Sequence, residues 1–291
     1  MQTATRSEPT PAKSMTPRAE TAKSSSEEFS ELVDEIIERT GLRKNQAWHQ
    51  AADEKPELYA RLKSEQDQLR AVRESQQRQQ EARERAERIT ASWNQTAGRF
   101  SACRFERFEI HGTPEEQAAQ QRIVSALSSR DVMRMAEDGQ NLLFVGPPGS
   151  GKDHLMHALA WRALHQLDGR IITRNEAALR QQLKKAVMES ADSEAALLRQ
   201  LIDTRLLLIS DPVPTGGKEL SDFQADSLYH VVDQRWTSKR PIWATLNLPV
   251  EAMRDAAITS LTAPVWDRLK DGALIVVCNW QSFRKPAEVL K

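Results

Sequence analysis

Five short apolar runs occur in the second part of this chain, and stretches with helical periodicity separate them. The runs are NLLFV (141–145), RIITR (170–174), RLLLIS (205–210), PIWATL (241–246) and ALIVVC (273–278). Continuously apolar strands are typical of parallel sheets, because the helices that connect parallel strands cover both faces. The pattern therefore predicts an α/β domain with a five-stranded parallel sheet.

The first apolar run leads directly into a glycine-rich segment, GPPGSGKDH, at residues 146–154. A GxxxxGK segment between a strand and a helix is typical of a phosphate-binding loop, in which backbone N–H groups surround the phosphates and the lysine reaches the β- and γ-phosphates. The dipole of the following helix adds attraction for the anion. We expect ATP to be bound by the loop residues Gly146, Pro147, Pro148, Gly149, Ser150, Gly151, Lys152, Asp153 and His154.

Two positions depart from the usual pattern of such a site. Asp153 stands where a Ser or Thr hydroxyl normally holds Mg²⁺. The strand 205–210 is followed by a single acid, so the pair is Ser210-Asp211, where related enzymes have one acid for the metal and one for the water. ATPase activity is predicted, but slow or absent hydrolysis is compatible with the incomplete pair.

The two departures suggest a hypothesis about the metal. Mg²⁺ prefers oxygen ligands and keeps several waters, so Asp153 and Asp211 together are predicted to hold it, directly or through water. The alternative is that Asp153 only caps the helix, because Asp is favourable at a helix N-terminus.

The N-terminal part of the chain differs in composition. Residues 1–26 are rich in Ser, Thr, Pro and Ala and have too little apolar surface to offset the entropy of ordering, which predicts a disordered tail. Ser24 and Glu27 have capping-box spacing, and Gly41 is a helix stop. Two short helices follow, and then a strongly polar stretch (64–88), which is interpreted as a solvated connecting helix rather than a coiled coil.

The predicted organisation is a tail at 1–26, a helical module with its connecting helix at 27–97, and an ATPase domain at 98–291. One apolar face of the first helix is formed by Phe29, Leu32, Val33, Ile36 and Ile37. Three uses of the module remain open. It can pack this face into the groove of a partner, satisfy the face within its own bundle, or read DNA as a helix-turn-helix.

The overall composition excludes several classes of protein. Acidic and basic residues balance at 41 each, so no global charge attracts nucleic acid. Cys103 and Cys278 are the two cysteines, which argues against a zinc knuckle or a disulfide framework. No apolar run approaches the length of a membrane span, so we expect a cytoplasmic protein without membrane contact.

Three stretches resemble the AAA+ domain of DnaC-type bacterial replicative helicase loaders and of the related IstB-type transposition ATPases. They are NLLFVGPPGSGKDHLMHALA, VVDQRWTSKRPIWATLNLP and PVWDRLKDGALIVVCNWQSFRK, in the family's order over roughly residues 100–285. Loaders of this type often have Asn or Asp after the loop lysine, followed by His-Leu, so GKDHL looks like a family variant. The resemblance implies an AAA+ P-loop fold that binds ATP and Mg²⁺.

The resemblance also implies roles for single residues. Asn247 matches the polar residue that helps to position the attacking water. Arg268 matches an arginine finger that reaches the nucleotide of a neighbouring subunit, which implies self-association. Arg284 matches an arginine that contacts the nucleotide of its own subunit. A basic stretch with Arg235 and Lys239-Arg240 is a weak candidate for DNA contact.

The predicted function is an ATP-binding loader that binds a hexameric replicative helicase through the N-terminal module and helps to place it on single-stranded DNA. One alternative is a transposase-helper ATPase that assembles on duplex DNA. Another is a scaffold that binds ATP without hydrolysing it.

Overall fold

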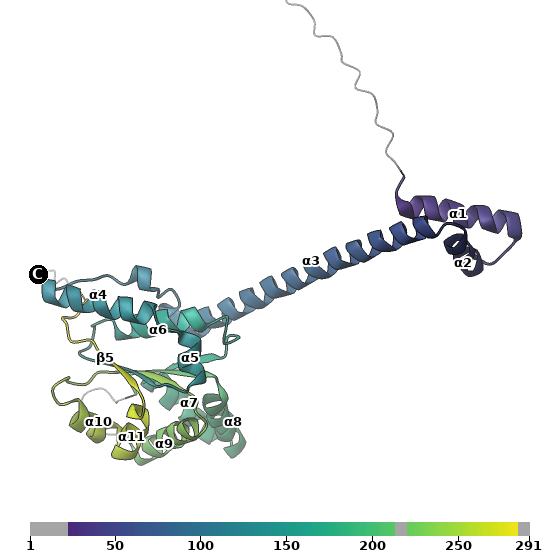
Figure 1. The fold of residues 1–291 in the computed structure, drawn as a ribbon. Helices are drawn as coiled ribbons and strands as arrows, with labels where there is room; N and C mark the ends of the chain where they lie inside the picture. The colour runs from purple at the N-terminus through teal and green to yellow at the C-terminus, as the bar shows by residue number, and fades with distance from the viewer. Residues whose placement is uncertain (1–22, 213–219, 285–291) are drawn as a thin grey trace, which may run out of the picture. The chain divides into compact units, whose positions relative to one another are not determined.

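The computed structural model describes residues 23–212 and 220–284 of the chain. The chain forms two compact units, which divide between Ala82 and Arg83 (Figure 1). The division lies inside helix α3 (Pro56–Ala97), so it is earlier than the 97/98 boundary predicted from composition. Most of the predicted tail, residues 1–22, lies outside the described residues, as do residues 213–219 of the loop after the third strand.

The first unit begins with helix α1 (Ser25–Thr40). The predicted capping box is present, because the Ser24 hydroxyl accepts from the Glu27 N–H and the Glu27 carboxylate accepts from the Ser24 N–H. Gly41 ends the helix with a left-handed φ of 68°. Because α1 starts at Ser25, its first two residues fall within the tail predicted at 1–26.

The three helices of this unit bury the apolar face of α1 among themselves. Helix α2 (Lys44–Glu54) and the start of α3 pack against it. The buried side chains are Phe29, Leu32, Val33, Ile36, Ala47, Ala51, Leu58 and Leu62. Of the three uses left open by the sequence, this packing favours a bundle that buries the face within itself, and it leaves the face unavailable for a partner groove.

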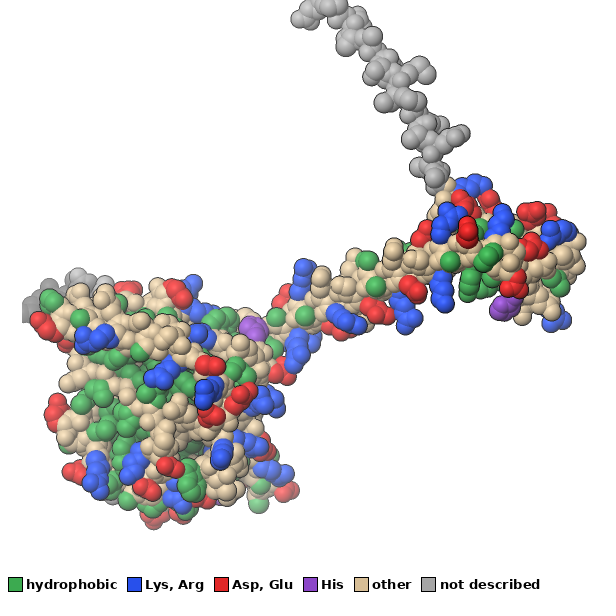
Figure 2. Space-filling view, in the orientation of Figure 1, with side chains coloured by type: hydrophobic (Ala, Val, Ile, Leu, Met, Phe, Trp, Pro, Cys, Tyr) green, Lys and Arg blue, Asp and Glu red, His purple; other side chains and the backbone are tan. Residues whose placement is uncertain are grey.

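The polar stretch beyond Leu62 belongs to α3 and continues it without a break. Figure 2 shows Lys and Arg side chains interspersed with Asp and Glu along it. Exposed pairs four residues apart, such as Arg70–Glu74, contribute only a few tenths of a kcal/mol each. In the described part of the first unit, the large apolar side chains that stay exposed are Leu69 and Val72, which are 58% and 52% exposed.

The second unit contains the predicted parallel sheet. Its strands are β1 (Leu142–Val145), β2 (Ile171–Asn175), β3 (Leu206–Ser210), β4 (Ile242–Leu246) and β5 (Leu274–Val277). All neighbours pair in parallel in the order β2-β3-β4-β1-β5. Each apolar run found in the sequence is a strand, which confirms the α/β prediction.

Helices cover both faces of the sheet (Figure 1). On one face lie the end of α3, α4 (Pro114–Ser128), α5 (Val132–Glu137) and α6 (Lys152–Ala163). On the other face lie α7 (Glu176–Glu189), α8 (Ala191–Asp203), α9 (Asp222–Thr237), α10 (Met253–Leu261) and α11 (Ala263–Lys270). The alternation of side chains along β1 divides the core: Leu142 and Phe144 face the first layer, Leu143 and Val145 the second.

Two short 3₁₀ turns, Gly98–Phe100 and Phe105–Arg107, connect α3 to α4. No helix among the described residues is both long and apolar enough to cross a bilayer.

Arg235 on α9 is fully buried, which rules it out as a DNA contact. Its guanidinium donates to the carbonyl oxygens of Leu201, Ile202 and Thr204 at the end of α8, and to that of Pro241 before β4. Burial lowers the pKa of Arg235 to about 9. The residue therefore joins α8, α9 and β4 by satisfying carbonyl groups that would otherwise be buried without partners.

We expect Arg235→Ala to destabilise the second unit by about 3–5 kcal/mol, because it leaves several buried carbonyl groups without donors. Urea unfolding monitored by circular dichroism measures the change. The matched control is Lys239→Ala on the exposed side of the same basic stretch, which should change stability by less than about 0.5 kcal/mol. Equal stability of the two variants would contradict the structural role of Arg235.

Candidate nucleotide-binding site

The predicted site lies at the carboxyl edge of the sheet. Strand β1 pairs with β4, and β4 pairs with β3, all in parallel, so the segments that follow these strands meet at one edge. These segments are the loop 146–151, the pair Ser210-Asp211 and Asn247. The carboxyl edge of a parallel sheet is where open α/β proteins bind ligands.

Close approaches require glycine at two positions of the loop. A Cβ atom on Gly146 would lie 2.2 Å from the carbonyl oxygen of Cys278, which follows β5. Gly151 is the N-cap of α6, with φ 84°, and a Cβ there would lie 2.7 Å from the ring of Phe108. Any other residue would be strained at φ 84°, so the chain can turn from β1 into α6 here because it has glycine.

Lys152 is held inside the loop. Its side-chain ammonium donates to the carbonyl oxygens of Gly146 (2.9 Å) and Pro147 (2.7 Å), and it is only 4% exposed. Burial lowers the pKa of this lysine below its ordinary value. A phosphate bound in the loop would compete with these carbonyls for the ammonium group. It would then give the buried ammonium an anionic partner in place of neutral ones.

Asp153 contacts the ends of β3 and β4. Its Oδ1 accepts a hydrogen bond from the Ser210 hydroxyl (2.5 Å) and another from the Thr245 hydroxyl (3.0 Å). The side chain thus points across the sheet edge rather than back to the N–H groups of its own helix. This arrangement disfavours the alternative that Asp153 only caps α6.

Asp211 lies directly after β3 and has a positive φ of 48°. Its N–H donates to the Thr245 carbonyl oxygen (2.9 Å) and lies 3.2 Å from the Thr245 hydroxyl oxygen. Its carboxylate accepts from the Asn247 side-chain amide. Burial raises the pKa of Asp211, an effect that Asn247 partly offsets. Thr245 therefore connects Asp153 and Asp211, and Asn247 orients the latter.

A cavity of about 470 Å³ opens over the loop, which is within the usual size of ligand sites. Arg284 lines it together with Lys152, Asp153, His154 and Asn247, so these predicted residues lie together. The same cavity is lined by residues that the motifs did not indicate, namely Arg99, Phe100, Arg107, Phe108, Glu109, His111 and Phe283.

Arg268 does not line this cavity. Its guanidinium pairs with the Asp233 carboxylate (2.7 Å) and lies over the rings of Tyr229 and Trp236 at 4.9 and 5.6 Å from their centroids. It is therefore a surface residue of the α9–α11 layer and does not serve the nucleotide site of its own chain.

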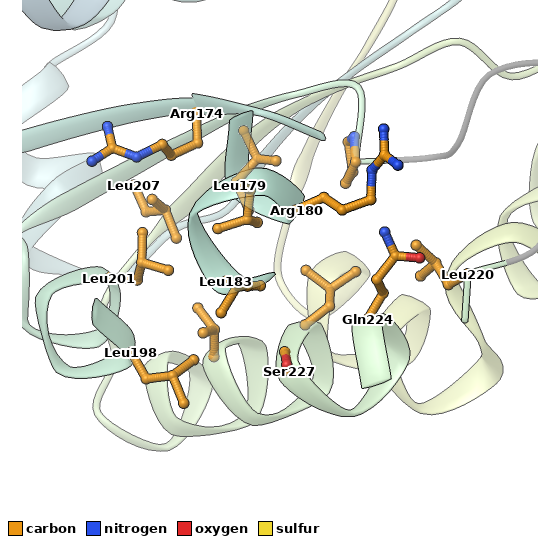
Figure 3. Close-up of a pocket in the computed structure, with 14 residues that line it drawn as sticks. Arg174, Leu179, Arg180, Leu183, Leu198, Leu201, Leu207, Leu220, Gln224 and Ser227 are labelled. Atoms are coloured by element: carbon orange, nitrogen blue, oxygen red, sulfur yellow. The ribbon is translucent and has the colours of Figure 1, made fainter. Parts of the chain in front are cut away.

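Another cavity, between β3 and the helices α7, α8 and α9, is not a nucleotide site. Figure 3 shows Leu179, Leu183, Leu198, Leu201 and Leu207 around it. Its volume of about 40 Å³ is far too small for a nucleotide.

The oxygen atoms at this edge of the sheet are suitable ligands for Mg²⁺. They are oxygen atoms of Asp153, Ser210, Asp211 and Thr245, beside the loop in which phosphates would lie. The described residues contain no cluster of three or more His, Cys, Asp or Glu side chains able to hold a metal by themselves. Mg²⁺ needs no such cluster, because it is commonly bound by one or two carboxylates, waters and substrate phosphates.

Thr245 and Phe108 were missed by the sequence analysis for different reasons. Thr245 lies inside an apolar strand two residues before Asn247, so a polar residue at that place was a usable signal. Phe108 is far from the loop in sequence and meets Gly151 only through the tertiary fold.

The fold and this site define a P-loop ATP-binding protein of the AAA+ class. The family model described as "IstB-like ATP binding protein" matches residues 72–290, so the chain belongs to that family. This match confirms the resemblance inferred from the three sequence stretches.

Several relatives of this chain are named as replicative helicase loaders, and another is named as uncharacterized. The "Replicative helicase loader DnaC" of Escherichia coli (strain K12) is 28% identical over 210 residues, which cover 70% of this chain and 79% of the relative. The "Uncharacterized protein YdaV" of the same strain is 28% identical over 183 residues. Among solved structures, the "Crystal structure of the DnaC helicase loader" aligns with a TM-score of 0.51 and 21% identity, covering 62% of this chain and 98% of the other. This structural match supports the fold alone.

We expect Lys152→Ala to weaken ATP binding by about 100-fold, because an ionic hydrogen-bond donor to the phosphates is lost. Isothermal titration calorimetry with Mg²⁺-ATP measures the effect. The matched control is Lys184→Ala on the exposed surface of α7, which should leave the affinity unchanged. Tight ATP binding by the Lys152 variant would show that the loop does not receive the phosphates.

Proposed function

We propose that this protein is an ATP-dependent loader of a replicative DNA helicase. The observation that carries the proposal is the phosphate loop with Lys152 beside Asp211 and Asn247, in a chain similar to DnaC over most of its length. The related loader is named for this role, and we extend the role to this chain. Such a protein would act in the cytoplasm.

The site residues have distinct roles in this proposal. Lys152 binds the β- and γ-phosphates of ATP, and Asp153 and Asp211 face Mg²⁺, which neutralises phosphate charge when bound. Asp211 also accepts a hydrogen bond from the attacking water, and Asn247 holds that carboxylate in place. Asp211 would then face both the ion and the water, with Asp153 as the second carboxylate at the ion, and this sharing of Asp211 is consistent with slow turnover.

The two arginines act from different subunits. Arg284 lines the cavity and would contact the nucleotide of its own chain. Arg268 lies on the surface with Asp233 and would have to exchange this partner for the γ-phosphate of a neighbouring subunit. The proposal therefore includes self-association when ATP is bound.

The N-terminal module is the proposed contact for the helicase. Its main apolar face is used inside the bundle, so the contact must use other residues. Leu69 and Val72 are the exposed apolar pair on α3 and are the best candidates in the described part of the module. Single-stranded DNA is the proposed second partner, and binding through its phosphates should weaken steeply with salt.

The test is complex formation with the replicative helicase of the host. We expect the full chain with Mg²⁺-ATP to co-elute with the helicase in size-exclusion chromatography. Leu69→Asp should reduce the yield of complex at least about tenfold, because it places a charge in an apolar contact. Ala71→Asp on the opposite side of α3 is the matched control and should bind normally. No complex with the wild-type chain would refute the loader function.

Two alternatives have specific observations in their favour. Membership of the IstB-like family is compatible with the transposase-helper ATPase that the sequence resemblance implies, which would assemble with ATP on duplex DNA and not bind the helicase. Ser210 in place of a second acid favours a scaffold that binds ATP without hydrolysis. Steady-state phosphate release with and without single-stranded DNA separates the scaffold from the loader, since the scaffold should show none in either case.

A further inference from the structure

We propose that Asp153 and Ser210 have exchanged roles, so that the carboxylate that faces the metal ion has moved from the end of β3 to the start of α6. This inference deepens the proposed ATP site and rests on it. In a usual phosphate-loop site, the residue after the lysine supplies a hydroxyl and the end of the facing strand supplies the carboxylate. This chain has the carboxylate after Lys152 and the hydroxyl after Ile209.

The geometry carries the exchange. The two side chains meet directly, with the Ser210 hydroxyl 2.5 Å from Asp153 Oδ1. The same two groups, one hydroxyl and one carboxylate, therefore stand at the same edge in reversed order. The formal charge of the pair is still a single negative charge, so the electrostatic demand of a bound divalent cation is met in either order.

Thr245 makes the reversed order workable. Its hydroxyl is the second donor to Asp153 Oδ1, at 3.0 Å, and the Thr245 hydroxyl oxygen itself accepts from the Asp211 N–H at 3.2 Å. Two hydroxyl donors on one oxygen fix the plane of the Asp153 carboxylate. No hydrogen bond to its other oxygen, Oδ2, is made by the side chains and backbone that the structure describes, and Oδ2 is the atom we assign to the ion or its water.

The exchange explains why Asp153, in place of a hydroxyl residue, occurs together with Ser210, in place of an acid. With aspartate at both 153 and 210, two carboxylates would stand where a hydroxyl now donates to one, and they would repel each other. With serine at both positions, the edge would retain hydroxyls but lose this charge. Only a combination with one acid and one hydroxyl at positions 153 and 210 keeps a negative charge for the metal ion without repulsion between two carboxylates.

The experiment measures the gain in ATP affinity that Mg²⁺ confers. A fluorescent ATP analogue is titrated into each full-length protein with excess Mg²⁺ and, separately, with EDTA. The ratio of the two affinities is compared for the wild type, Asp153→Ser, Asp153→Asn, Ser210→Asp and the reversed pair Asp153→Ser/Ser210→Asp. Thermal melting of each protein checks the fold.

We expect the ratio to fall at least about tenfold in Asp153→Ser and in Asp153→Asn, the latter keeping the shape and an acceptor oxygen without the charge. Ser210→Asp should also lower it, because of the repulsion. The reversed pair should recover the wild-type ratio to within about threefold. Electron paramagnetic resonance of Mn²⁺ with bound ADP gives a second readout that does not depend on turnover, and it should follow the same order.

Two results would overturn the exchange. One is an unchanged ratio in Asp153→Asn. The other is a reversed pair that folds and binds ATP in EDTA but gains nothing from Mg²⁺. If the wild type itself binds no nucleotide, the proposed function fails rather than the exchange alone, so the two failures are distinguishable.

Discussion

One carboxylate oxygen joins three segments of the ATPase unit. Asp153 Oδ1, at the start of α6, accepts from Ser210 at the end of β3 and from Thr245 inside β4. This contact is possible because the order β3-β4-β1 brings the carboxyl ends of these strands to one edge. The same strand order sets the relative positions of the phosphate loop, the acid after β3 and the amide after β4. An apolar residue at 153 would leave both hydroxyls without this acceptor.

The parts predicted from the sequence are those that neighbouring residues determine. The strands follow from short apolar runs, the capping box from Ser24 and Glu27, and the loop from its own glycines. The contact between Asp153 and Ser210 joins residues 57 positions apart in the sequence. A local sequence pattern cannot predict a contact between residues so far apart. Sequence reasoning linked these two positions by their chemistry alone, and the sheet order supplies the reason.

The two arginines are the opposite case, in which a sequence pattern misleads. Arg235 lies in a basic stretch that resembles a surface patch, yet it is fully buried against carbonyl groups. Arg268, on a neighbouring helix, stays on the surface beside two aromatic rings. The side chain alone does not distinguish the two, because both are charged residues on amphipathic helices. The decisive factor is the set of unsatisfied carbonyls at the end of α8, which only the packed structure reveals.

The residues after β5 are bound to the phosphate loop at several points. The Trp280 indole donates to the Ser150 carbonyl, the Phe283 N–H donates to the Gly149 carbonyl, and the Cys278 N–H donates to the Val145 carbonyl. Strand β5 is also an edge of the sheet. Because these hydrogen bonds join the loop to the edge strand, any displacement of the loop backbone would be transmitted to this open margin of the sheet.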